Sequence, residues 1–296
     1  MMHALVFDVF GGPEVLSYRE VPAPALLPGT ALNYHLEGKP PWILGYEGAG
    51  TVVAVAEGDE ANVKLGARVA FADVPCANAE IVRAPLDKLV PLPEGVSFET
   101  AAAVILQGLT AQYLVRDSHA LAAGELAVVH ASGGGVGLLL TQLARRAGAR
   151  DAGAFATASY DEDWPALVRG SSPNGRGADV VFDSVGSTLQ RSLDAARVGG
   201  HVVFYGMAGG DPSPFDPRRL MDESKSLTGG DLWNVLTSAG ERCRRSAELF
   251  ALVERGDLRV TITRTLPLSR GGEAHALLEG RGVIGKLVLV PDEADG

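Results

Sequence analysis

The chain contains only two cysteines among its 296 residues, Cys76 and Cys243, and they lie far apart in the sequence. So few cysteines exclude a disulfide-dense scaffold and are typical of a reducing compartment, although a single bridge between the two is left open. Cys76 on its own is interpreted as an ordinary buried or surface thiol rather than a metal ligand. The low cysteine content is consistent with a cytoplasmic protein.

Long apolar runs and long basic runs are also missing. No apolar stretch approaches the ~20 residues that a membrane span needs. The N-terminal residues alternate like a strand and lack the basic flank and cleavage site of a signal peptide. The net charge is −10, and no basic run is longer than a pair such as 218–219 or 244–245, which argues against a nucleic-acid surface. We therefore expect a cytoplasmic protein that binds neither membranes nor nucleic acids.

The chain does contain enough apolar material for a sizeable core. Hydrophobic residues make up 46% of it, its mean hydropathy is +0.12, and its length suggests one or two domains. Before residues 91–95 the apolar segments are short, rich in strand-forming residues and punctuated by glycine and proline. This pattern predicts a β-barrel-like module whose strands are ALVFDVF, GAGTVVAVA, ARVAFA, AEIVRAP and KLVPL.

After residue 95, strand-like runs alternate with helical patterns. Helices are expected over 98–115, 136–147 and 164–168, and strands over LAVVH, DVVFDSV and HVVFYG. Such alternation predicts an α/β fold, a doubly wound parallel sheet wrapped by helices. Strand character returns at 260–268, and KLVLV closes the chain as a final strand.

The most informative segment runs from residue 126 to residue 148, LAVVHASGGGVGLLLTQLARRAG. An apolar run ends at small residues, and a helical pattern begins directly after a glycine cluster. Ser132, Gly134 and Gly137 match the spacing of the dinucleotide fingerprint G-x-G-x-x-G, with serine in the first position. Small residues let backbone N–H groups approach phosphates, and a helix N-terminus favours negative charge. The alternative is an ordinary glycine-rich turn, but the flanking strand and helix favour a pyrophosphate site.

A set of segments in one order extends this interpretation to nearly the whole chain: FGGPEVL, ILGYEGAG, LVPLPEGVSFETAA, LQGLTA, VHASGGGVG, VVFDSVG, VVFYGM and GKLVLVP. Together they resemble the quinone oxidoreductase (zeta-crystallin-like) branch of the medium-chain dehydrogenase/reductase superfamily. The resemblance implies a GroES-like β-rich domain over residues 1–94, a Rossmann domain over 95–262, and a return to the GroES-like domain over 263–296. It also implies NADPH as hydride donor, a small quinone or α,β-unsaturated carbonyl substrate, and a homodimer.

The same segments bear on zinc. Metal-dependent relatives carry histidine before the glutamate of ILG-x-EGAG, whereas this chain has Tyr46 before Glu47. A neutral phenol is a poor replacement for imidazole as a zinc ligand. The clustered cysteines of a structural zinc lobe are absent as well. No metal is therefore expected, and the enzyme's work would be binding, orientation and electrostatics around the nicotinamide.

The resemblance also implies individual site residues. Asn33 would hydrogen-bond and orient the substrate near the nicotinamide, and Tyr34 is a candidate proton donor, although packing is the stronger interpretation for it. The implied cofactor-binding residues are Tyr113, Gly134, Gly135, Val136, Gly137, Tyr160, Gly206, Met207, Leu232 and Arg281. Tyr160 and Arg281 match positions that contact the 2′-phosphate in NADPH-dependent members, a role that suits guanidinium chemistry. Tyr113 is equally well explained as a core tyrosine, and Arg281 as a solvated cation at a helix end.

Two departures from the family pattern stand out. A strand expected after residues 22–30 is missing, which affects the placement of Asn33. In the Rossmann half, DAGAFATASYDEDW follows Arg150 where a β-branched second strand and a helix should stand. We therefore expect a sheet that lacks one strand–helix unit, with a strand over 155–160 filling the position or a slot left open beside the first strand. NADPH is inherited from the family without local support, and NADH is the alternative.

Three functions from different classes follow. The first is NADPH-dependent, zinc-independent reduction of quinones or α,β-unsaturated carbonyls by hydride transfer. The second is a degenerate member that folds, and binds nucleotide weakly or without turnover. The third is a non-enzymatic binding protein, for which RNA is the least suitable ligand because the chain is acidic. Survival of the glycine turn favours the first.

Overall fold

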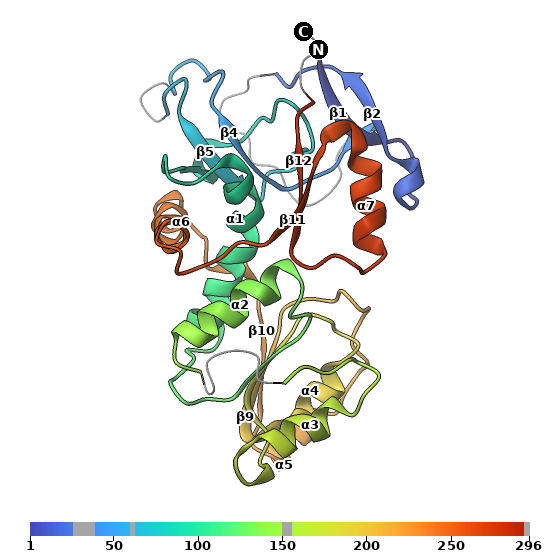
Figure 1. The fold of residues 1–296 in the computed structure, drawn as a ribbon, viewed down its shortest axis with the longest axis vertical. Helices are drawn as coiled ribbons and strands as arrows, with labels where there is room; N and C mark the ends of the chain where they lie inside the picture. Colours follow the sequence, from blue (N-terminus) through green and yellow to red (C-terminus); the bar gives the residue numbers. More distant parts are fainter. Residues whose placement is uncertain (26–38, 60–62, 150–155, 293–296) are drawn as a thin grey trace. The chain divides into compact units, whose positions relative to one another are not determined.

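The structure is a computed structural model that describes residues 1–25, 39–59, 63–149 and 156–292. It divides into two compact units, one formed by Met1–Leu109 with Leu236–Gly296 and the other by Thr110–Val235. The first unit therefore combines both ends of the chain, drawn in blue to teal and in orange to red in Figure 1. The units divide the chain at other residues than the predicted domain boundaries, 94 and 262, which stay a prediction.

The described residues of the first unit form three small sheets. Their strand orders are β2-β1-β3, β4-β5-β6 and β11-β12. The strands are β1 (Met2–Phe7), β2 (Ser17–Val21), β3 (Trp42–Ile43), β4 (Glu47–Thr51), β5 (Arg68–Ala72), β6 (Leu89–Pro91), β11 (Ile262–Pro267) and β12 (Lys286–Val290). The first two sheets are antiparallel, and β11 pairs with β12 in parallel. The predicted final strand thus pairs with the strand predicted over 260–268.

The strand predicted over AEIVRAP is wrong. Ala79 makes a single bridge to Ala4 of β1, and no strand follows it. The edge of β1 that it meets is shared with β3, so the pairing is confined to the residues around Ala79. Ile81 is 39% exposed, so this large apolar side chain does not point into a core as a half-buried strand would require.

In the described residues, three α-helices complete the first unit. They are α6 (Ala239–Glu254), α7 (Gly271–Glu279) and most of α1 (Phe98–Tyr113), whose last residues belong to the second unit. Helix α7 packs against the N-terminal strand β2, so the end of the chain closes on its beginning (Figure 1). Ser238 caps α6 by accepting a hydrogen bond from the N–H of Glu241.

The second unit is built on four parallel strands in the order β10-β9-β8-β7. They are β7 (Ala127–Val129), β8 (Ala178–Asp183), β9 (Ala196–Phe204) and β10 (Ser226–Gly229), and four helices accompany them: α2 (Gly135–Arg146), α3 (Trp164–Ser171), α4 (Leu189–Ala195) and α5 (Arg218–Asp222). Every residue of β8 is buried, as expected for a central strand of a parallel sheet. The predicted α/β class, helices and strands of this half are confirmed.

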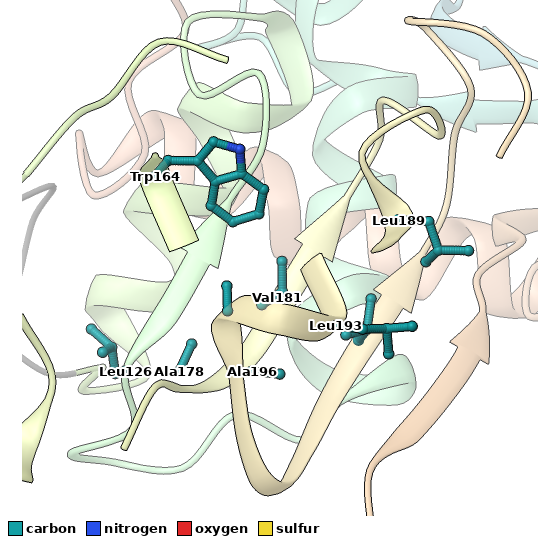
Figure 2. Packing of buried hydrophobic residues seen from close by; sticks show 9 residues of the cluster. Leu126, Trp164, Ala178, Val181, Leu189, Leu193 and Ala196 are labelled. Carbon is teal, nitrogen blue, oxygen red and sulfur yellow. The ribbon is translucent and has the colours of Figure 1, made fainter. Parts of the chain in front are cut away.

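An apolar cluster joins the sheet to α3 and α4. It contains Leu126, Trp164, Ala178, Val181, Leu189, Leu193, Ala195, Ala196 and Val202. Figure 2 shows these side chains, with Trp164 at the first turn of α3 and Leu189 and Leu193 on α4. Asp163 begins α3 by accepting a hydrogen bond from the N–H of Ala166, and Pro165 suits the first helical turn. The cluster therefore anchors the helix that follows the shortened segment.

The sheet ends at β7 in the part of the chain that the structure describes. A complete doubly wound dinucleotide sheet has the order 3-2-1-4-5-6, in which the first strand lies between the second and the fourth. Strands β7, β8, β9 and β10 correspond to strands 1, 4, 5 and 6 of that order. Residues 156–160 are exposed and form no strand. A filling strand over 155–160 is thus wrong for its described residues, because this segment is too poor in β-branched and large apolar residues to add a buried strand.

Within the described ranges, no helix is both long enough and apolar enough to cross a membrane.

A histidine pair ties four segments of the second unit together. The Nδ1 atoms of His119 and His201 are 3.0 Å apart, and the outer ring nitrogens lie 2.9 Å from Glu125 Oε2 and 2.7 Å from Thr228 Oγ1. One of the two facing nitrogens must donate and the other must accept, so the pair cannot carry two full positive charges and keep this bond. Burial, followed by the neighbouring His119, lowers the pKa of His201.

This pair predicts acid sensitivity of folding. Because the pKa of His201 is lowered in the folded state, the unfolded chain binds more protons below the ordinary pKa of 6.5, and stability falls as the pH falls through this region. We expect the urea midpoint of the wild type to decrease between about pH 7.5 and about pH 5.5, and that of His201→Gln to decrease less. An equal decrease in the two proteins would contradict the assignment.

Candidate nucleotide-binding site

The glycine turn joins β7 to α2. Ala131 adopts a left-handed conformation with a φ of 47°, and the N–H of Gly134 donates to the carbonyl oxygen of Ala131 at 2.9 Å. The first bond of α2 runs from the N–H of Leu138 to the carbonyl oxygen of Gly134, at 3.0 Å. Gly134 is the N-cap residue, provides no side-chain cap, and is followed by no acidic residue in the first turn.

The start of α2 therefore offers hydrogen-bond donors. Among the described contacts, the N–H groups of Gly135, Val136 and Gly137 have no acceptor, as expected for the first turn of a helix. These groups and the helix dipole favour a negatively charged ligand at this end. The arrangement is the one that the sequence predicts for a pyrophosphate group.

Gly137 is the glycine that the packing requires. A Cβ atom at this position would lie 2.3 Å from the carbonyl oxygen of Ala131 and 2.7 Å from the Cα of Ser132. At Gly133 a Cβ would meet nothing within 4 Å, and at Gly134 it would be 3.2 Å from the Ala131 oxygen. The third position of the fingerprint thus keeps the helix close to the turn, whereas Gly133 has room for a side chain.

A buried carboxylate supports the turn from the neighbouring strand. Asp183, at the end of β8, is fully buried and accepts hydrogen bonds from the N–H groups of Val185 and Gly186 at 2.9 and 3.1 Å. It also accepts from the hydroxyl groups of Thr188 and Ser192, at 2.9 and 2.6 Å. The sequence analysis did not identify this group. Its signal is a charged residue that ends an apolar strand and is followed by glycine, serine and threonine.

His130 connects the carboxylate network to the turn. It is buried directly after β7, and its ring nitrogens lie 3.4 Å from Thr188 Oγ1 and 3.3 Å from Ser192 Oγ. Burial lowers its pKa, so the neutral ring is favoured. These contacts give His130 a structural role between the end of β7 and the start of α4.

Tyr160 lies against the glycine turn. Its hydroxyl oxygen accepts a hydrogen bond from the N–H of Ala131 at 2.8 Å, and its ring centroid is 5.5 Å from that of His130. The side chain remains 43% exposed, and burial of its remainder raises its pKa. The residue expected at the 2′-phosphate is thus fixed beside the carboxyl end of β7.

The loops that follow β8 and β9 meet at the same edge of the sheet. The N–H of Ala208 donates to the carbonyl of Ser184 at 3.0 Å, and a Cβ at Gly206 would lie 3.0 Å from that same oxygen. Met207 is 56% exposed. Because the carboxyl ends of parallel strands share one edge, Gly206 and Met207 lie at the edge that carries the glycine turn.

The other predicted residues have different positions. Leu232 follows β10 and is buried in a short helix that Asp231 caps through the N–H of Trp233. Tyr113 is buried in α1, with no described contact to the turn. Arg281 belongs to the first unit, where it follows α7 with a φ of 55°. Asn33 and Tyr34 lie outside the described residues.

A polar cluster that the sequence analysis did not identify surrounds Glu47 in the first unit. Its carboxylate accepts hydrogen bonds from Lys286 Nζ at 2.7 Å and from Gln107 Nε2 at 2.9 Å. The ammonium group of Lys286 therefore balances the negative charge of Glu47, the residue that follows Tyr46. Across the described ranges, no group of three or more histidine, cysteine, aspartate or glutamate residues is arranged to hold a metal ion.

Two family models match this chain, one in its N-terminal part and one in its C-terminal part. Residues 27–125 match the model of the alcohol dehydrogenase GroES-like domain, and residues 152–289 match that of a zinc-binding dehydrogenase. A quinone oxidoreductase of Pseudomonas aeruginosa is 35% identical over 327 aligned positions, which cover 98% of this chain and 100% of the relative. The alignment is longer than the 296 residues of this chain, so the relative carries residues that this chain lacks.

Solved structures agree with the sequence matches. The mycobacterial protein Rv1454c in complex with NADPH is 33% identical, with a TM-score of 0.89 over 98% of this chain and 100% of its own. The Escherichia coli quinone oxidoreductase in complex with NADPH is 30% identical, with a TM-score of 0.87 over the same shares. A 2-haloacrylate reductase of a Burkholderia species is 31% identical over 98% of this chain and 99% of the relative.

Proposed function

Because the chain belongs to the quinone oxidoreductase branch of the medium-chain dehydrogenase/reductase superfamily, we propose that it is an NADPH-dependent oxidoreductase that reduces quinones or α,β-unsaturated carbonyl compounds without zinc. The observation that supports this most strongly is the donor set at the start of α2, beside a glycine at which a Cβ would meet backbone. Bound NADPH supplies the hydride, and the protein binds and orients the two reactants.

The residues of the second unit suit such a cofactor. The N–H groups of Gly135, Val136 and Gly137 would hold the pyrophosphate, and Gly134 leaves room for its approach. Gly206 and Met207, at the carboxyl edge of the sheet, would contact the nicotinamide end, and Leu232 would close over it. Tyr113 is proposed to contact the same end. Tyr160 is proposed to contact the 2′-phosphate. Arg281, which belongs to the first unit, is the other residue proposed for this contact, from the family pattern alone.

The reacting end of the site rests on the family pattern. Asn33 is proposed to orient the substrate carbonyl by hydrogen bonding, with Tyr34 as its neighbour. Zinc independence is proposed because Tyr46 replaces the histidine ligand, and because the ammonium group of Lys286 forms an ion pair with the carboxylate of Glu47. A cytoplasmic homodimer that binds a small quinone or enone completes the proposal.

A spectrophotometric assay tests this function. We expect the purified chain to oxidise NADPH when phenanthrenequinone or an α,β-unsaturated ketone is added, at a rate proportional to enzyme and unchanged by a chelator such as EDTA. Loss of the activity with EDTA, restored by zinc, would contradict the metal-free chemistry.

A second candidate function follows from the open edge of β7. Without a strand on that side in the described residues, the adenosine half of the nucleotide has fewer contacts, which favours a member that binds NADPH without turnover. Raised thermal stability with NADPH but no consumption of NADPH with either class of acceptor would favour this alternative.

A further inference from the structure

Arg191 brings a positive charge to the side of β7 on which the described residues form no second strand. In a dinucleotide fold the adenosine ribose lies beyond the carboxyl end of the second strand, next to the first. Here that position lies beside the carboxyl end of β7, where Tyr160 bonds to Ala131. Arg191, on α4, donates to the carbonyl oxygen of Tyr160 at 2.6 Å. We propose that Arg191 recognises the 2′-phosphate of NADPH and thereby sets the preference for NADPH over NADH.

The guanidinium group of Arg191 is held in one position. A second hydrogen bond joins it to the carbonyl oxygen of Glu162, and its central carbon lies 5.2 Å from the centroid of the Trp164 ring. The side chain is half-buried, which reduces the screening of its charge. The two hydrogen bonds use two of its five N–H donors, so the others are available to an anion. A rigid, planar donor set of this kind suits phosphate oxygens.

The surroundings leave this charge available. Both described hydrogen bonds of Arg191 go to backbone carbonyls, and in the described ranges no carboxylate forms an ion pair with it. The carboxylate of Glu162 accepts from the N–H of Ser159, and that of Asp163 caps α3. Burial lowers the pKa of His130 despite the opposing charge of Asp183, so the neutral ring is favoured and His130 adds no second cation beside Arg191. Arg191 is therefore the cation that the contacts of 160–162 place beside the turn.

The acidic residues around it explain why a cation is needed there. Residues 161–163 carry three carboxylates in succession, and these repel the two negative charges of a ribose phosphate. NADH carries no such phosphate and gains nothing from Arg191. The contribution of Arg191 should consequently appear as a difference between the two nucleotides rather than as a general effect on binding.

The inference rests on the proposed function, and calorimetric titration of the intact protein tests it separately. We expect Arg191→Gln to weaken NADPH binding by roughly tenfold to a hundredfold while the affinity for NADH changes by less than about twofold. Adenosine 2′,5′-bisphosphate should lose affinity as NADPH does, and adenosine 5′-monophosphate should not. Arg191→Lys keeps the charge without the planar fork and should lie between the wild type and Arg191→Gln.

Arg169→Gln is the matched control. Arg169 is also half-buried and donates to a backbone carbonyl, that of Asp194 at 3.0 Å, but no described contact joins it to the turn. The Arg169→Gln variant should bind both nucleotides as the wild type does. If Arg191 only fastens the segment 160–162, its replacement will lower the melting temperature of the free protein and weaken NADPH and NADH equally, which overturns the inference. A wild type that binds neither nucleotide overturns the proposed function instead.

Discussion

Gly137→Ala is expected to remove most of the nucleotide binding of this protein. The new methyl carbon would stand 2.3 Å from the carbonyl oxygen of Ala131 and 2.7 Å from the Cα of Ser132. Both contacts are backbone atoms, so no side-chain rotation relieves them, and α2 must move away from the turn. Alanine is ordinarily the better helix former by about 0.5–1 kcal/mol. Overpacking costs about 1–3 kcal/mol and should outweigh this gain.

Displacement of α2 also moves the donors of the site. Loss of two charge-assisted hydrogen bonds at about 1.5 kcal/mol each corresponds to on the order of a hundredfold in affinity. Urea unfolding and titration with NADPH measure the two effects. Gly133→Ala is the control within the same turn, because a Cβ there meets nothing within 4 Å. It should fold and bind as the wild type does, and equal losses in both variants would contradict the account of the turn.

Asp183→Ala is expected to cost at least about 3 kcal/mol of folding free energy. The substitution leaves the N–H groups of Val185 and Gly186 and the hydroxyls of Thr188 and Ser192 without their acceptor, in a site closed to solvent. Asp183→Asn keeps one good acceptor oxygen and should be intermediate. Urea unfolding of the three proteins gives the comparison.

Asp194→Ala provides the contrast on the neighbouring helix. This carboxylate lies at the surface, where its described partner is Arg219, and exposed ion pairs of this kind contribute about 0–1 kcal/mol. A loss for Asp183→Ala as small as that for Asp194→Ala would show that the buried network does not support the strand end.

Local chemistry explains which parts of the site were predictable. The turn at 131–137 is predicted by an apolar strand, small residues and an apolar helix that follow one another in one continuous segment. The steric need for glycine at Gly137 also arises from atoms only a few residues away. The absence of a strand over 156–160 was predictable in the same way, because these residues contain no valine or isoleucine and only one large side chain, that of Tyr160.

Contacts between distant segments were not predictable. The hydrogen bonds of Asp183 require that Thr188 and Ser192, at the start of α4 and within it, lie beside the end of β8. The hydrogen bond from Arg191 to Tyr160 joins residues 31 positions apart in the chain. Glu47 meets Lys286 only because the two ends of the chain fold into one unit. The prediction of a strand over AEIVRAP was wrong for a similar reason, because the edge of β1 that Ala79 meets also pairs with β3. The roles of Asn33 and Tyr34 stay predictions.

In the part of the chain that the structure describes the sheet ends at β7, and we expect the protein still to bind NADPH through the turn that follows this strand. Calorimetric titration of the intact wild-type chain with NADPH tests it most directly. We predict saturable binding of one nucleotide per chain, with a dissociation constant of about 1 μM to 1 mM, and its loss in Gly137→Ala. Absence of saturable binding at millimolar NADPH in a folded wild-type protein would contradict the claim.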